Sequence, residues 1–156
     1  MKRLHAVGLG LFLVLTLTGT LWSQGVLKTG MDSALQVVQT RKYLMHTVKL
    51  NVEDAAKKFE ADHLGDIQAN GAAVALAAKV MPPLFREKHE AVYDGQGKFF
   101  KGAEPAAFEA ACETMRTAAQ NVRMSAEKVD KAGVMEAMGA LQQSCGACHS
   151  AYRGSF

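Results

Sequence analysis

The stretch Cys145-Gly146-Ala147-Cys148-His149 lies seven residues before the end of this 156-residue chain. Two cysteines separated by two residues and followed directly by a histidine form the pattern for covalent attachment of haem. Each thiol adds to one vinyl group of the ring, and the adjacent histidine becomes the proximal ligand of the iron. We therefore expect Cys145 and Cys148 to hold one haem c group and His149 to bind its iron.

Two other kinds of site use a Cys-x-x-Cys pair, namely thioredoxin-like redox sites and zinc sites. A thioredoxin-like pair would follow a β-strand in a chain of alternating strands and helices, and no convincing strand pattern is visible here. A zinc site needs a fourth ligand at close spacing. Only distant residues could supply it: Cys112, His46, His63 and His89. Both alternatives therefore fit the sequence less well than covalent haem.

The first 25 residues have the features of a secretory signal. A basic start is followed by an uncharged apolar run over residues 6–21, and Ser23-Gln24-Gly25 is the best candidate for the residues before the cut. An uncleaved anchor is the alternative, although glycines and threonines weaken the run as a membrane span. We expect cleavage, export to the periplasm, and a mature domain over residues 26–156 that is not bound to a membrane.

The charge balance excludes some partners. The net charge of +3 falls to +1 once Lys2 and Arg3 are removed with the signal. This is not the balance of a nucleic-acid-binding protein, and it indicates no charged patch that would steer a particular partner.

Four segments of the mature chain have helical periodicity, over residues 32–60, 64–81, 105–129 and 131–152. Asp32 or Ser33 would cap the first, Pro82-Pro83 would stop the second, and Pro105 suits the first position of the third. Each segment has one apolar stripe. The stripes are Leu35, Val38, Met45, Val48, Val52, Ala55 and Phe59; Ile67, Gly71, Val74, Ala78 and Met81; Phe108, Cys112, Met115, Ala119, Val122, Ala126 and Val129; and Val134, Met138, Leu141, Cys145, Cys148 and Tyr152.

Four helices with one apolar stripe each bury these stripes most simply against one another. We therefore predict an all-α fold, an antiparallel four-helix bundle in up-down-up-down order, with covalently attached haem whose sulfurs point into the core. Residues 82–104 would be one long crossover, and Phe85, Tyr93, Phe99 and Phe100 suggest that it lies against the domain. On its stripe, Cys112 is expected to be a small buried hydrophobe rather than a reactive thiol.

The iron bound by His149 has a sixth coordination position on the other side of the haem ring. The group at that position decides between electron transfer and small-ligand chemistry. The candidates are Met45, His46, His63, Met81 and His89. Arg41 and Met45 are four residues apart and share the inward face of the first helix, where an arginine needs an acidic partner. His46 would point about 100° away from Met45, and we expect it, His63 and His89 at the surface. Position alone would leave Met45 as ordinary core.

Several of these features resemble the class II c-type cytochromes, the cytochrome c′ family. The C-terminal haem motif followed by Tyr152-Arg153 is similar to that of the family. Arg41 with Met45 looks like its Arg-x-x-x-Met or Arg-x-x-x-Leu signature. Residues 66–85 look like its second helix and the segment that leaves this helix. The resemblance covers the chain from about residue 30 to the end. The family's frequent tryptophan after the crossover is absent here.

The resemblance implies a function through the residue at position 45. Family members with an apolar residue there have five-coordinate iron that binds nitric oxide or carbon monoxide, whereas a low-spin branch has methionine as sixth ligand and moves electrons. Met45 therefore favours a one-electron carrier with His149 and Met45 as axial ligands, and gas binding is the alternative. The resemblance also allows a homodimer through the first two helices.

Two arginines have a structural and a functional interpretation. Arg41 and Arg153 either pair with carboxylates of the bundle or lie beside the haem, where a guanidinium suits a propionate. We expect redox proteins as partners. Outer-sphere electron transfer needs no catalytic acid, base or nucleophile, so we expect no enzymatic activity.

Overall fold

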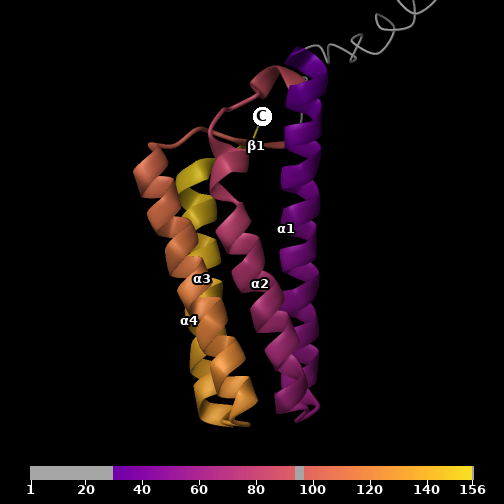
Figure 1. Cartoon of the computed structure of the whole chain (residues 1–156), viewed down its shortest axis with the longest axis vertical. Helices are drawn as coiled ribbons and strands as arrows, with labels where there is room; N and C mark the ends of the chain where they lie inside the picture. Colours follow the sequence, from indigo (N-terminus) through magenta and orange to yellow (C-terminus); the bar gives the residue numbers. More distant parts are fainter. Residues whose placement is uncertain (1–29, 94–96, 156) are drawn as a thin grey trace, which may run out of the picture.

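The fold is a bundle of four long helices, shown in Figure 1. The structure is a computed structural model that describes residues 30–93 and 97–155. Its helices are α1 (Gly30–Glu60), α2 (Gln68–Val80), α3 (Pro105–Glu127) and α4 (Lys131–Tyr152). Neighbouring helices run in opposite directions, so the predicted up-down-up-down bundle is confirmed. The predicted signal, residues 1–25, lies outside the described residues.

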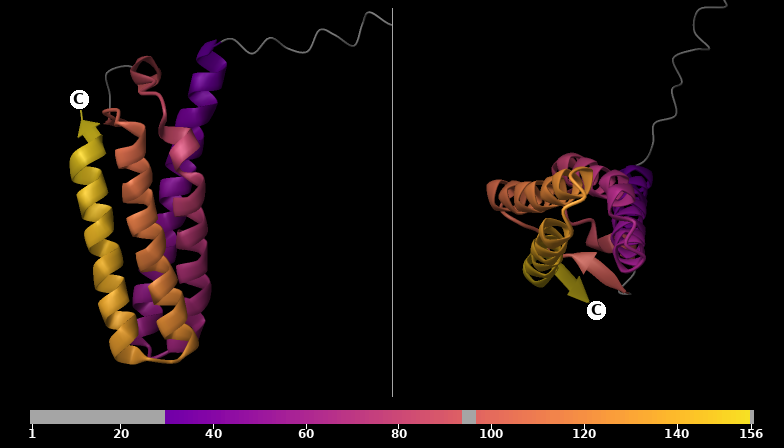
Figure 2. Two further views of the ribbon diagram at one scale, coloured as in Figure 1. Left: turned by 60° about the vertical axis from the view of Figure 1, so that its left-hand side comes forward. Right: turned by 90° about the horizontal axis from the view of Figure 1, so that it is seen from below.

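The helices pack in the order of the chain, α1 on α2, α2 on α3 and α3 on α4. The first and last helices have no comparable packing against each other. In the end-on view of Figure 2, α1 and α4 stand apart, while α2 and α3 close the other side. None of the helices in residues 30–93 and 97–155 is both long and apolar enough to cross a membrane.

Capping explains where two of the helices begin. The Glu104 side chain accepts a hydrogen bond from the Ala107 N–H at the start of α3, and Pro105 is its first residue, as predicted. The Asp130 side chain caps α4 through the Gly133 N–H. For α1 the predicted cap is wrong, because the helix begins at Gly30 and includes Asp32 and Ser33.

The predicted apolar stripes form most of the core, but Leu35 and Val129 are exposed. Val129 has a φ of 54° and is 62% exposed, because α3 ends at Glu127 and the chain turns before the cap of α4. At the centre of the bundle, α2 and α3 come very close at Gly71. A Cβ added there would lie 2.7 Å from the Arg123 backbone nitrogen and 2.8 Å from the Ala119 carbonyl oxygen. Only glycine allows this approach.

The crossover contains short elements that the sequence did not predict. Two 3₁₀ helices, η2 (Pro82–Phe85) and η3 (Glu90–Tyr93), lead to the strand β1 (Lys98–Phe100). This strand pairs antiparallel with β2 (Arg153–Ser155), which directly follows α4. The prediction of no strand was therefore wrong at this end of the bundle. The expectation that the crossover lies against the domain is confirmed, since Phe100 is 5% exposed.

Candidate haem-binding site

The haem motif lies in the last two turns of α4, which ends at Tyr152. Cys145 and Cys148 are partly buried and pack against the hydrophobic core, whereas His149 is exposed. Residues at spacings of three and four lie on the same side of a helix. The two thiols and the imidazole are therefore presented together on one side of α4.

The protein environment shifts the pKa values of all three groups. Burial raises the pKa of the Cys145 thiol and that of the Cys148 thiol, so both groups are neutral near pH 7. Partial loss of water lowers the pKa of His149, and the nearby Arg153 charge lowers it further. A lower pKa favours the neutral imidazole, which is the form that binds metals.

Met45 lies on α1 at about the height of the motif. Counting 1.5 Å per residue, Met45 is about 22 Å above Glu60, the lower end of α1, and His149 is about 27 Å above Lys131, the lower end of α4. These two lower ends are linked, because Lys131 Nζ lies 2.7 Å from the Asp62 carboxylate and 5.7 Å from the centre of the Phe59 ring. By this count Met45 and His149 lie within about one helical turn of each other along the bundle.

The facing sides of α1 and α4 are apolar, and the backbones of these two helices approach each other less closely than those of helices adjacent in the chain. Several hydrophobic side chains on these two helices are only partly buried, namely Leu44, Met45 and Val52 on α1 and Met138, Cys145, Cys148 and Tyr152 on α4. Two thiols, an imidazole and a thioether are the donors that a c-type haem uses, and the surrounding side chains suit an apolar ring. The residues present therefore fit a haem group.

Arg41 is the most deeply buried charged residue of this region, at 3% exposed. Its guanidinium donates hydrogen bonds to the carbonyl oxygens of Leu84, Glu87 and Lys88 in the crossover. Burial lowers the pKa of Arg41, opposed by the Tyr93 hydroxyl and the Glu87 carboxylate. The expected acidic partner was wrong, because backbone carbonyls take its hydrogen bonds; a propionate contact stays a prediction.

The remaining candidates lie elsewhere. His46 and His63 are exposed, as expected, while His89 is partly buried 3.7 Å from the Glu87 carboxylate. Met81 is a buried core residue. Within residues 30–93 and 97–155, no three His, Cys, Asp or Glu side chains are grouped so that they could hold a metal ion. The zinc alternative therefore finds no set of ligands in the described chain.

Arg153 and Cys112 have different surroundings. Arg153 is exposed in β2, opposite Phe100, and forms no ion pair within the part of the chain that the structure describes. Cys112 is 4% exposed on α3, as expected of a core residue. Burial raises the pKa of the Cys112 thiol to about 12, with smaller contributions from Cys148 and Glu109.

A family model described as Cytochrome C' matches residues 36–153, which include Arg41, Met45 and the whole haem motif. The chain belongs to the cytochrome c′ family. It is therefore a c-type cytochrome, and membership implies a haem c group. No curated protein and no solved structure matches the chain.

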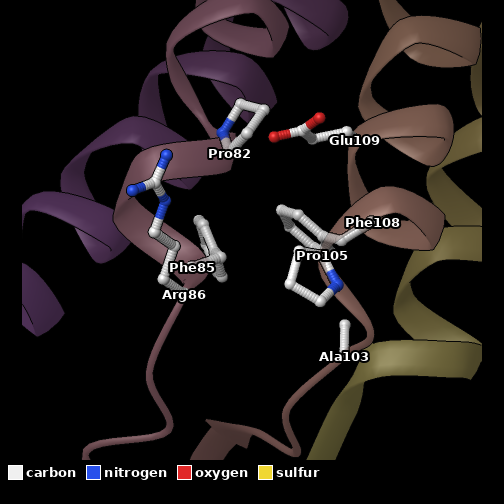
Figure 3. A pocket seen from close by; sticks show the side chains of 7 residues that line it. All are labelled: Pro82, Phe85, Arg86, Ala103, Pro105, Phe108 and Glu109. Carbon is white, nitrogen blue, oxygen red and sulfur yellow. The ribbon is translucent and has the colours of Figure 1, made fainter.

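Sequence reasoning missed the aromatic cluster that closes this end of the cytochrome. The Phe85 ring stacks on Phe108 at 5.1 Å and meets the edge of Phe100 at 5.2 Å, and Phe108 also contacts Tyr152. Figure 3 shows Phe85 of η2 and Phe108 of α3 on facing sides of a hollow of about 20 Å³. This volume holds about one water molecule, so it is no haem site. The run of aromatic residues around the crossover was the available signal.

Proposed function

We propose that this protein is a periplasmic one-electron carrier with one haem, attached through Cys145 and Cys148 and axially ligated by His149 and Met45. The observation that carries the proposal is the set of partly buried apolar side chains on α1 and α4, which includes Met45 and both cysteines of the haem motif. When bound, haem c supplies a single-electron couple between ferric and ferrous iron.

The surrounding residues have three roles in such a carrier. The thioether of Met45 favours the reduced state and raises the potential. The core side chains around Cys145, Cys148 and Tyr152 limit the access of water. As sixth ligand, the Met45 thioether would exclude a small ligand from the iron. None of these roles uses a catalytic acid, base or nucleophile, so the proposed carrier is not an enzyme.

The proposal includes where the protein acts and with what. The secretory signal and the haem motif together support the periplasm. Redox proteins are the proposed partners. A homodimer through α1 and α2 is supported by apolar side chains exposed on these helices: Tyr43, Leu50, Leu76 and Val80.

Gas binding is the second candidate, and it is favoured by the partial exposure of Met45. In that case the methionine would pack beside a five-coordinate iron or be displaced by nitric oxide or carbon monoxide.

Replacing Met45 by leucine separates the two functions. If Met45 is a ligand, M45L changes the iron from low-spin to high-spin, allows carbon monoxide to bind and lowers the midpoint potential. The matched control is Met115→Leu, which alters a buried methionine of α3 and leaves the spectrum unchanged. A wild-type protein that is already high-spin, with a spectrum unaltered by M45L, would contradict the carrier and support gas binding.

A further inference from the structure

The side chain of Arg41 joins α1 to the crossover in an unusual way. It is almost fully buried on an otherwise apolar helix face. Arg41 Nε donates to the Leu84 carbonyl at 2.6 Å, Nη2 donates to the Glu87 carbonyl at 2.6 Å, and Nη1 donates to the Lys88 carbonyl at 3.4 Å. Hydrogen bonds from a charged donor are stronger than neutral ones. One side chain thus gathers three backbone carbonyls of η2 and the residues after it.

Two aromatic rings complete the surroundings of this guanidinium. Its central carbon lies 4.9 Å from the centre of the Phe85 ring and 5.5 Å from that of Phe100. Such distances are within the range of cation–π attraction. Lysine cannot replace this arrangement, because its ammonium group lacks the planar fork that reaches several acceptors at once.

From these rings, a continuous series of contacts leads to the end of the haem helix. Phe85 and Phe100 both contact Phe108, and Phe108 contacts Tyr152 in the last turn of α4. Phe100 belongs to β1, which pairs with β2 directly after α4. The Lys101 N–H also donates to the Tyr152 carbonyl at 2.9 Å. Arg41 of α1 is therefore connected to the last turn of α4 through the crossover.

We propose that Arg41 is a positioning residue for the sixth ligand: it fixes the separation of α1 and α4 at the upper end of the bundle, so that Met45 reaches the iron bound by His149. This inference rests on the proposed function. Met45 lies one turn after Arg41, so a shift of α1 relative to the crossover moves the thioether as well. The other link between these helices, from Lys131 to Asp62, lies at the opposite end.

The test compares Arg41→Met with a control that weakens α1 elsewhere. Methionine keeps the apolar length of arginine but donates no hydrogen bond. The control is Asn70→Ala, which removes a buried amide bonded to Asn51, Asp54 and Lys58 near the lower end of α1. Each holoprotein is measured for its high-spin fraction, its carbon monoxide association rate and the hydrogen exchange of the amides of residues 84–93.

For R41M, we expect at least a tenfold faster association of carbon monoxide, a larger high-spin fraction and faster exchange in residues 84–93. N70A should stay within twofold of wild type in carbon monoxide association, even where it unfolds at a lower temperature. Phe100→Leu removes one of the two rings beside the guanidinium but none of the three hydrogen-bond acceptors of Arg41. It weakens the same link and should change carbon monoxide association and the high-spin fraction in the direction of R41M. This variant keeps the test valid where R41M does not fold.

Two results would overturn the positioning role while the proposed function stands. One is a low-spin wild type whose carbon monoxide association and spin state are unchanged in R41M and F100L. The other is a shift of the midpoint potential in R41M without any change of spin state, which indicates that Arg41 acts through charge on a propionate. A high-spin wild type would contradict the ligation by Met45 itself, and the positioning role with it.

Discussion

The α2–α3 interface and the α1–α4 pair are built from different side chains. Between α2 and α3 many buried residues are alanine or glycine, and Gly71 lies against the backbone of Ala119 and Arg123. Between α1 and α4 the side chains are long and only partly buried, such as Met45, Met138 and Tyr152. Small residues let two backbones approach closely, whereas long flexible side chains adapt to irregular space.

This difference separates the structural half of the bundle from the half that we assign to haem. The α2–α3 interface packs without any further group. The α1–α4 pair is instead held at its two ends, by Lys131 with Asp62 below and by Arg41 with the crossover above. The close α2–α3 contact thus stabilises the fold, whereas the partly buried side chains of α1 and α4 are the ones that we propose to contact the haem.

The largest expected effect is the loss of covalent haem from the motif in α4. Cys145→Ala combined with Cys148→Ala removes both thiols and should abolish covalent haem completely, because no other residue forms the thioether bonds. Mass spectrometry of the purified protein would show a chain without the added mass of haem. Cys112→Ala is the matched control and should retain haem, since Cys112 lies outside the motif. Haem retained by the double variant would refute the assignment of the motif.

The second prediction concerns the closely packed interface between α2 and α3. Gly71→Ala places a methyl group against backbone atoms of α3 that cannot move aside, and overpacking of this kind costs about 2 kcal/mol in the free energy of unfolding. Denaturant unfolding measures the loss. The control Gly139→Ala adds a methyl group to α4 at a position with no atom within 4 Å, and it should stabilise the helix by about 0.5–1 kcal/mol. Equal stabilities of the two variants would show that α2 and α3 are not in close contact.

The smallest expected effect is the dependence of stability on pH through Cys112. Burial raises the pKa of the Cys112 thiol in the folded protein to about 12, whereas the pKa of a thiol in the unfolded chain is about 8.5. Between these values the unfolded state loses a proton that the folded state keeps, so stability falls as pH rises.

This loss should reach about 1.4 kcal/mol by a pH of about 9.5. Unfolding curves of wild type and Cys112→Ala, each measured at neutral and at alkaline pH, isolate the contribution of this thiol. The variant should lose less stability than wild type over the same interval. Parallel losses in the two proteins would indicate that Cys112 is not protected by burial.

Much of this architecture could be predicted from the sequence, because the signals are local. The periods of the four apolar stripes placed the helices, and Pro105 marked the start of α3 within one residue. The haem motif was evident from its spacing alone. Local signals also explain one error, since Val129 continues a helical spacing that the following turn interrupts.

The features that could not be predicted depend on distant parts of the chain. The strands β1 and β2 have three residues each, too few for an alternating pattern to be recognised. The partners of Arg41 are backbone carbonyls more than forty positions away, and a carbonyl group has no signature in the sequence. The burial of Arg41 could be inferred from its helix face, but its role as a link to the crossover required the structure.

The most direct test of ligation by both His149 and Met45 is the visible absorption spectrum of the mature wild-type protein, oxidised and reduced, with and without carbon monoxide. The proposed carrier should give sharp low-spin bands that do not change when carbon monoxide is added. Broad high-spin bands that shift with carbon monoxide would contradict it, because they would show an open coordination position where Met45 is expected.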